Sequence, residues 1–316
     1  MSGYVRLVLA IIVLLSHVGV RINDLNPGVI AVVIFYIFAG SVVTYVWHDI
    51  IPDRKNKIFL FYKNRVLRIF PLYLYAMVLT LFFLMATSYG TPSYQILPLI
   101  NNILIIPLNY YMFIDSTVIK NPDWNLVPPA WSLGTELQAY ILLPIIFCFK
   151  WLGRLLVFIS FIIYMMANFS YIETDYFGYR LLPGVFFIFF IGSHLRNCVE
   201  KKNSYFSLLI FYAAAIFYLG SVMEQNISVP YIEETLLGLI IGIPLAIGLM
   251  KLKHRLKYDQ QAGALSYGVF LMHFLVIWWI DFMQIMPSIG IKYYLTVIFL
   301  TISIAGCGVL IVEKRH

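Results

Sequence analysis

Residues 28–47 read GVIAVVIFYIFAGSVVTYVW, twenty consecutive positions without a charged side chain. A hydrocarbon core about 30 Å thick is crossed by roughly 20 apolar residues in an α-helix, so this stretch is typical of a membrane span. The rest of the chain is similar in character, because 61% of its 316 residues are hydrophobic and only 12% are charged. Soluble domains carry about 25% charged residues. The sequence therefore predicts an integral membrane protein and excludes an ordinary soluble enzyme.

Apolar stretches of bilayer length recur along the whole chain. We expect about ten transmembrane helices, near residues 4–20, 28–47, 69–87, 130–149, 152–168, 181–196, 205–222, 235–250, 265–282 and 290–312. The stretch 95–112 is also apolar, but prolines and asparagines interrupt it, which favours a re-entrant or interfacial segment. The predicted fold class is all-α and polytopic, and residues 1–316 are expected to form a single membrane domain.

The basic residues predict the orientation of these spans. With the N-terminus in the cytoplasm and ten spans, 18 of the 22 Lys and Arg residues fall in cytoplasmic segments, that is, all 22 but Arg21, Lys120, Arg180 and Lys292. Cytoplasmic loops of membrane proteins carry such an excess of positive charge. We therefore expect both termini in the cytoplasm and interpret the net charge of +7 as a topology signal, with no nucleic-acid partner.

The cysteines and the first apolar run have plain interpretations. Cys148, Cys198 and Cys307 lie in or beside apolar spans without a zinc-ligand spacing or a disulfide framework, so we expect small hydrophobic side chains and no metal. The run that follows Arg6 resembles a signal peptide but lacks a small-residue cleavage site, and it is expected to be a retained first helix.

Arg6 and His17 stand out because ionisable side chains are costly at membrane depth. They are eleven residues apart, so on one helix they share a face and are separated by about 16 Å. Arginine suits an anionic phosphate at the cytoplasmic edge, and imidazole suits proton transfer. The same pair is also typical of a topology-setting arginine and a packing histidine.

Arg65 and Arg68 form a second basic pair, placed one helical turn apart before Pro71. Two neighbouring guanidinium groups can bind a phosphate or pyrophosphate through bidentate hydrogen bonds. A simple excess of cytoplasmic positive charge is the alternative interpretation.

Two later segments carry further polar groups inside apolar runs. Ser132, Glu136 and Tyr140 recur at four-residue spacing and share one helical face, and a buried Glu136 requires a partner, for which His17 is a candidate. A structural glutamate bonded to backbone or tyrosine is the alternative. Ser266 and His273 are seven residues apart and again nearly in register, and His273 is equally well explained as a packing histidine.

These segments, taken in order, resemble the motifs of the acyltransferase 3 family of membrane acyl-CoA transferases. The motifs are the Arg6–His17 spacing, Arg65-Val-Leu-Arg68 ahead of Pro71 and Tyr73, the block Trp131-Ser132-Leu133-Gly134-x-Glu136-x-Gln138-x-Tyr140, and Ser266-Tyr267 with His273. The resemblance covers most of the chain. Phe270 and Met272 depart from it, since tyrosine and tryptophan are common there.

The resemblance implies an acyltransferase of class EC 2.3.1.-, most simply an O-acetyltransferase of the bacterial inner membrane. Acetyl-CoA or another acyl-CoA would be the donor, and a polysaccharide or glycolipid of the envelope the acceptor. Arg6, Arg65 and Arg68 would bind the CoA phosphates, His17 would act as general base or transient acyl carrier, and Glu136 would orient or stabilise it. Trp131, Ser132, Tyr140, Ser266 and His273 would support the site. We expect the stand-alone form, without the esterase-like domain fused to some relatives.

Two other functions compete with this interpretation. His17, Glu136 and His273 could form the proton relay of a secondary transporter, although no internal repeat is visible. A membrane scaffold that binds glycans through the aromatic-rich segment 88–130 is the third possibility, and the same segment is our candidate for acceptor contact in an enzyme.

Overall fold

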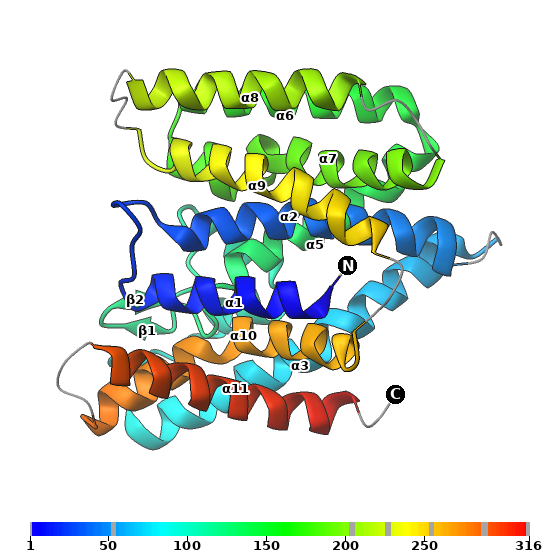
Figure 1. The fold of residues 1–316 in the computed structure, drawn as a ribbon. Helices are drawn as coiled ribbons and strands as arrows, with labels where there is room; N and C mark the ends of the chain where they lie inside the picture. Colours follow the sequence, from blue (N-terminus) through cyan, green and yellow to red (C-terminus); the bar gives the residue numbers. More distant parts are fainter. Residues whose placement is uncertain are drawn as a thin grey trace. The chain divides into compact units, whose positions relative to one another are not determined.

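The computed structural model describes residues 2–51, 55–201, 206–224, 229–252, 256–285 and 290–313 (Figure 1). Within these ranges lie eleven α-helices: α1 (Gly3–His17), α2 (Pro27–Tyr45), α3 (Lys57–Thr87), α4 (Ile96–Leu104), α5 (Ala130–Cys148), α6 (Lys150–Asn168), α7 (Leu182–Lys201), α8 (Phe206–Glu224), α9 (Ile232–Lys251), α10 (Asp259–Met283) and α11 (Ile291–Glu313). Short elements connect them: π-helices η1 (Val46–Ile50) and η3 (Asp175–Arg180), the 3-10 helix η2 (Ile106–Tyr110), and strands β1 (Ile119–Lys120) and β2 (Asp123–Trp124). Six basic residues of the predicted cytoplasmic set lie outside the described residues: Arg54, Lys202, Lys253, Arg255, Lys314 and Arg315.

Eight of the described helices are long and apolar enough to cross a membrane, and Gly3–His17 and Leu208–Glu224 are shorter apolar helices. Each of the ten predicted spans coincides with one of these ten helices. The prediction of an all-α, polytopic membrane protein is therefore confirmed.

Three boundaries differ from the sequence prediction. Helix α3 begins at Lys57 and continues through Pro71, whereas the third span was expected to begin near residue 69. A proline inside a helix removes one backbone hydrogen bond, and membrane helices tolerate this where neighbouring groups compensate. Helix α1 ends at His17, and the segment 95–112 forms α4 and η2, separated at Ile105, whose φ is +66°.

The chain forms two compact units, which are described separately. Unit 1 comprises Met1–Ser2, Val20–Lys63 and Thr135–Leu256, and unit 2 comprises Gly3–Gly19, Asn64–Gly134 and Lys257–His316. The division passes through helix α5 between Gly134 and Thr135.

Helix α2 is the central helix of unit 1 and packs against α7 and α9 (Figure 1). Its apolar residues surround the whole helix, as expected for a buried helix. Gly40 and Gly192 let the backbones of α2 and α7 approach closely, since a Cβ atom at Gly40 would lie 1.8 Å from the Phe189 carbonyl oxygen. Small residues allow such contacts between membrane helices. Beside this contact the Thr44 hydroxyl donates to Ser193 Oγ over 2.7 Å.

Helix α10 is the corresponding central element of unit 2, where it packs against α1 and α11. Gly3 lies against Asp259 and Gly263, and His17 lies against His273, so α1 and α10 run parallel. The first and ninth spans of an alternating series cross a membrane in the same direction. Because α10 is the ninth span when α4 does not cross, this packing supports the ten-span order.

Asn102 organises the segment between α3 and α5 in unit 2. Its side chain, fully buried, donates to the carbonyls of Pro98 and Ser116, each over 2.8 Å, and accepts from the Leu126 amide over 2.9 Å. The hydroxyl of Tyr73 in α3 donates to the Asn102 carbonyl over 2.6 Å. The bonds to Ser116 and Leu126 satisfy backbone groups that lie outside helices and strands, as burial requires.

The glycine contact in unit 1 gives a test of the packing. Replacing Gly40 by Ala places a methyl group against the α7 backbone, and overpacking of this kind costs about 1–3 kcal/mol or more. We expect Gly40→Ala to lower the unfolding temperature of the detergent-solubilised protein. Gly220→Ala is the matched control, because Gly220 is exposed on α8 with open space around it. Equal unfolding temperatures for the two variants would contradict the close approach of α2 and α7.

Candidate functional site

The parallel helices α1 and α10 carry four of the predicted site residues. The Gly3 amide donates to Asp259 Oδ1 over 2.7 Å. One turn further along α1, the backbone carbonyl of Arg6 accepts from the Ser266 hydroxyl over 2.8 Å. Ser266 is buried and Arg6 half-buried. These bonds fix where Arg6 lies along α10, and the register in turn fixes where His17 meets that helix.

At the other end of this helix pair, His17 stacks on His273. Their ring centroids are 5.3 Å apart with an interplanar angle of 22°, and the Phe274 ring lies 4.8 Å from His17. His17 is exposed, whereas His273 is 0% exposed. His17 is the last residue of α1, whereas the first span was expected to continue to about residue 20. A histidine in the last turn lies where a helix favours positive charge.

The two nitrogens of His273 have different surroundings. Nδ1 lies 3.1 Å from the Val269 carbonyl oxygen, a contact that requires a proton on Nδ1. With Nδ1 protonated, the neutral ring presents a lone pair at Nε2. Among the described residues, Nε2 has no hydrogen-bond partner although it is buried. A buried acceptor without a hydrogen-bond partner is unusual in a protein core. This one belongs to the ring against which His17 stacks.

The segment 88–130 reaches the neighbours of His17. Trp124, in β2, lies 5.2 Å from Phe274 between ring centroids, and the Tyr89 hydroxyl donates to Asp281 Oδ2 over 2.6 Å. Burial, followed by this bond to Asp281, raises the pKa of Tyr89. The aromatic segment therefore belongs to the surroundings of the histidine pair.

Two of the three predicted phosphate-binding arginines, Arg6 and Arg68, lie at or next to backbone carbonyls that side chains of α10 bind. Ser266 contacts Arg6, and the hydroxyl of the next residue, Tyr267, donates to the Ile69 carbonyl over 3.0 Å. Ile69 directly follows Arg68 in α3. Two adjacent residues of α10 thus bind the backbones of α1 and α3, at Arg6 and at the residue that follows Arg68.

Arg65 and Arg68 differ in their surroundings. Arg65 is 9% exposed, and its guanidinium donates to Asn64 Oδ1 through Nε over 3.1 Å and through a second nitrogen. Arg68 is exposed. Both lie inside α3, one turn apart, so the expected spacing on one helix is present.

The predicted residues of α5 fall on both sides of the division between the units. Trp131 and Ser132 belong to unit 2, are buried, and the Ser132 hydroxyl donates to the Pro129 carbonyl over 3.0 Å. Glu136 and Tyr140 belong to unit 1, where the Tyr140 hydroxyl donates to Glu136 Oε1. This bond matches the alternative in which a tyrosine pairs with Glu136, and the pairing of Glu136 with His17 stays a prediction.

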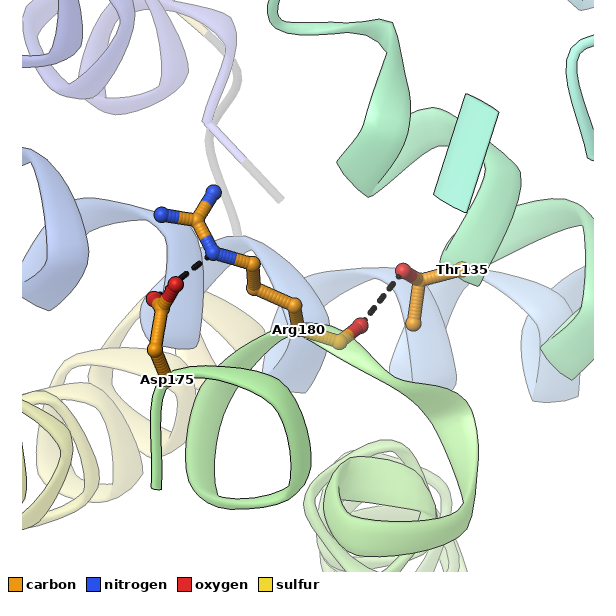
Figure 2. Close-up of polar contacts among 3 residues, drawn as sticks. All are labelled: Thr135, Asp175 and Arg180. Atoms are coloured by element: carbon orange, nitrogen blue, oxygen red, sulfur yellow. Dashed lines mark hydrogen bonds and ion pairs between the residues drawn. The ribbon is translucent and has the colours of Figure 1, made fainter. Parts of the chain in front are cut away.

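Thr135, the residue before Glu136, is bonded to Arg180 of an ion pair that the sequence did not predict (Figure 2). Arg180 Nε donates to Asp175 Oδ1 over 2.7 Å, and the Thr135 hydroxyl donates to the Arg180 carbonyl over 2.9 Å. A spacing of five residues gives no helical pair in a sequence, because it brings side chains together only in a π-helix such as η3. Phe274 was missed for a similar reason, since an aromatic residue in an apolar span carries no signal.

The described part of the chain contains no group of three or more His, Cys, Asp or Glu residues that could hold a metal ion. The ionisable groups of the candidate site are imidazoles, carboxylates and guanidinium groups, which suit proton transfer and anion binding.

Comparison with known proteins agrees with this chemistry. A family model described as an acyltransferase domain matches residues 3–313. A protein of Aquifex aeolicus described as uncharacterized is 39% identical over 212 residues, which cover 65% of this chain and 96% of that protein. No solved structure matches the chain.

The buried Nε2 of His273 generates a stability test. A buried acceptor without a partner costs about 1–3 kcal/mol, and phenylalanine preserves the shape of the ring. We expect His273→Phe to unfold at or above the wild-type temperature, while His273→Ala unfolds lower because it leaves a cavity. A His273→Phe protein that unfolds well below the wild type would contradict the absence of a partner for Nε2.

Proposed function

Because the chain belongs to the acyltransferase 3 family and is a multi-pass membrane acyltransferase of class EC 2.3.1.-, we propose that it transfers an acetyl group from acetyl-CoA to a carbohydrate hydroxyl. The acceptor is a polysaccharide or glycolipid of the cell envelope, and the protein resides in the inner membrane of a bacterium. The carrying observation is the α1–α10 pair, which has Arg6 near one end and the exposed His17 at the other. The predicted family membership and enzyme class are confirmed.

The donor binds at the arginine end of this helix pair. CoA carries phosphate groups, and guanidinium groups bind phosphate through paired, charge-assisted hydrogen bonds. Arg68 is exposed and Arg6 is half-buried, so a phosphate group can reach both. Arg65 adds positive charge and is already oriented by Asn64. The donor's thioester arm then extends along α1 toward His17, over about 16 Å.

His17 carries out the proton transfer. In the direct route its unprotonated ring nitrogen takes the proton of the acceptor hydroxyl, the oxygen attacks the thioester carbonyl, the C–S bond breaks, and the CoA thiolate takes that proton from the imidazolium. In the covalent route a ring nitrogen of His17 attacks the thioester carbonyl, the C–S bond breaks and the CoA thiolate leaves. The acceptor oxygen then attacks the acetyl carbonyl, the C–N bond breaks, and the hydroxyl proton passes to the thiolate. In both routes positive charge develops on His17, which the adjacent Phe274 face and the C-terminal end of α1 stabilise.

The remaining predicted residues support this reaction. The His273 ring holds the His17 ring in place by stacking, and Ser266 fixes the register of the two helices. Trp124, beside Phe274, offers an aromatic face for a sugar ring in the segment proposed for acceptor contact. We assign Glu136 to orienting or stabilising the imidazole, with Tyr140, Trp131 and Ser132 supporting α5 around it. A proton-coupled transporter has no comparable support, since the family is one of acyltransferases.

Removing His17 tests the chemical step. We expect His17→Ala to lower acetyl transfer from acetyl-CoA to envelope glycan in membrane vesicles by at least about 100-fold, the contribution of a positioned acid or base. His48→Ala is the matched control, because His48 is an exposed histidine at η1 that takes no part in the proposed steps. Cells with the intact protein, with His17→Ala and without the protein should differ in the same way in surface acetyl content. Equal acetyl content in all three would reject the proposed function.

The arginines predict an effect on donor affinity. Loss of one charge-assisted contact, worth about 1.5–3 kcal/mol, should raise the KM for acetyl-CoA about tenfold or more in Arg68→Ala. Arg68 is exposed, so the unfolding temperature should stay at the wild-type value, whereas Arg65→Ala should lower it as well because Arg65 is buried. Lys292→Ala, an exposed basic residue of α11, is the control. An unchanged KM after both arginines are replaced would remove them from the donor site.

A further inference from the structure

Unit 1 contains a polar cluster that the proposed reaction leaves unexplained. Its members are Tyr36 of α2, Thr135 and Glu136 of α5, and Asp175 and Arg180 of η3. Polar and ionisable groups inside membrane segments are costly, and they are usually retained for a function. Glu136 is the member that the proposed function already uses.

An ion pair joins the first and last residues of η3. Asp175 is its first residue and Arg180 its last, and the 2.7 Å bond between their side chains spans the whole element. Both side chains are largely buried, with 18% of Arg180 and 24% of Asp175 exposed. The Arg180 guanidinium also lies 5.3 Å from the centre of the Tyr179 ring. The end of η3 is therefore held rigidly.

This rigid end is bonded to the turn of α5 that carries Glu136. Thr135 is 0% exposed, and its hydroxyl donates to the Arg180 carbonyl over 2.9 Å, as Figure 2 shows. Glu136 is the next residue of the helix. The bond thus fixes the rotation of α5 about its axis at the position where the Glu136 side chain leaves the backbone.

A third element faces the same groups. The Tyr36 hydroxyl is buried and makes no hydrogen bond of standard geometry with any described residue. Thr135, Glu136 and Arg180 are among its neighbours. Tyr36 therefore adds a buried polar group of α2 beside the α5 turn that carries Glu136.

We infer that Arg180 is a positioning residue for the Glu136 carboxylate, acting through the bonds Asp175–Arg180 and Thr135–Arg180. Asp175 orients the guanidinium, the ion pair holds η3, and the Arg180 carbonyl receives the Thr135 hydroxyl and so sets the direction of Glu136. This inference rests on the proposed function, because it assumes that Glu136 contributes to acetyl transfer.

The decisive variants, at Thr135, change the bond and leave the charges in place. Thr135→Val keeps the size of the side chain but removes the hydroxyl, and Thr135→Ser restores the hydroxyl. We expect Thr135→Val to lower kcat for acetyl transfer about tenfold per folded molecule with an unchanged KM for acetyl-CoA, and Thr135→Ser to remain near the wild type. Asp175→Asn and Arg180→Lys should lower kcat in the same manner, because neither preserves the ion pair with the fixed geometry of a guanidinium.

A double variant tests whether these residues act through Glu136. If they only position that carboxylate, Thr135→Val in a Glu136→Gln background should change the residual turnover by less than about twofold, because coupled residues give non-additive effects. A further tenfold loss in that background would overturn the inference.

The unfolding temperature of each detergent-solubilised variant separates positioning from simple stabilisation. Variants that unfold earlier but keep the wild-type kcat per folded molecule would show a purely structural role and reject the inference. Acetyl transfer by the wild type distinguishes failure of the proposed function from failure of the inference about Arg180. A wild-type protein without transfer activity rejects the proposed function, whereas an active wild type with fully active Thr135→Val and Asp175→Asn variants rejects the role of Arg180 alone.

Discussion

The backbone contact between the parallel helices α1 and α10 is the constraint on which the candidate site depends. Gly3 carries no side chain that would hold the helices apart, and Ser266 donates directly to the Arg6 carbonyl. In lipid, apolar side chains gain little by leaving their surroundings, so close packing and interhelical hydrogen bonds determine which helices associate. The register of α1 against α10 therefore determines two positions: that of Arg6 near one end of the helix pair and that of the stacked imidazoles near the other.

Hydropathy and charge predicted most of the fold because a bilayer imposes strict lengths on its spans. All ten predicted spans have a helix, and the errors lie at their ends. Pro71 suggested a helix start, but α3 continues through it, and no sequence pattern distinguishes a proline that a membrane bundle tolerates from one that ends a helix. Asn102 lies inside α4 and not at the break after Leu104, and its four hydrogen bonds could not be predicted because three of them join Tyr73, Ser116 and Leu126 from outside its own helix.

The candidate site was predictable where its residues share a helix and unpredictable where they meet through tertiary contacts. Spacings of seven and eleven residues identified the faces that carry His17 and His273, and the structure stacks these two rings. The exposure of His17, the cover provided by Phe274 and the hold of Tyr267 on α3 follow only from packing. Thr135 and Arg180 are 45 residues apart, and their bond joins a hydroxyl to a backbone carbonyl, a group that every residue possesses.

The pairing of the first helix with the tenth also sets the order in which the protein matures. Residue 17 leaves the ribosome long before residue 259, and at about 5–20 residues per second the delay is roughly 10 to 50 s. During that time α1 resides in the bilayer without the helix that bonds to its Arg6 carbonyl and covers its terminal histidine. The imidazole pair can form only after α10 has been synthesised, so the reaction proposed for His17 has to wait for that helix.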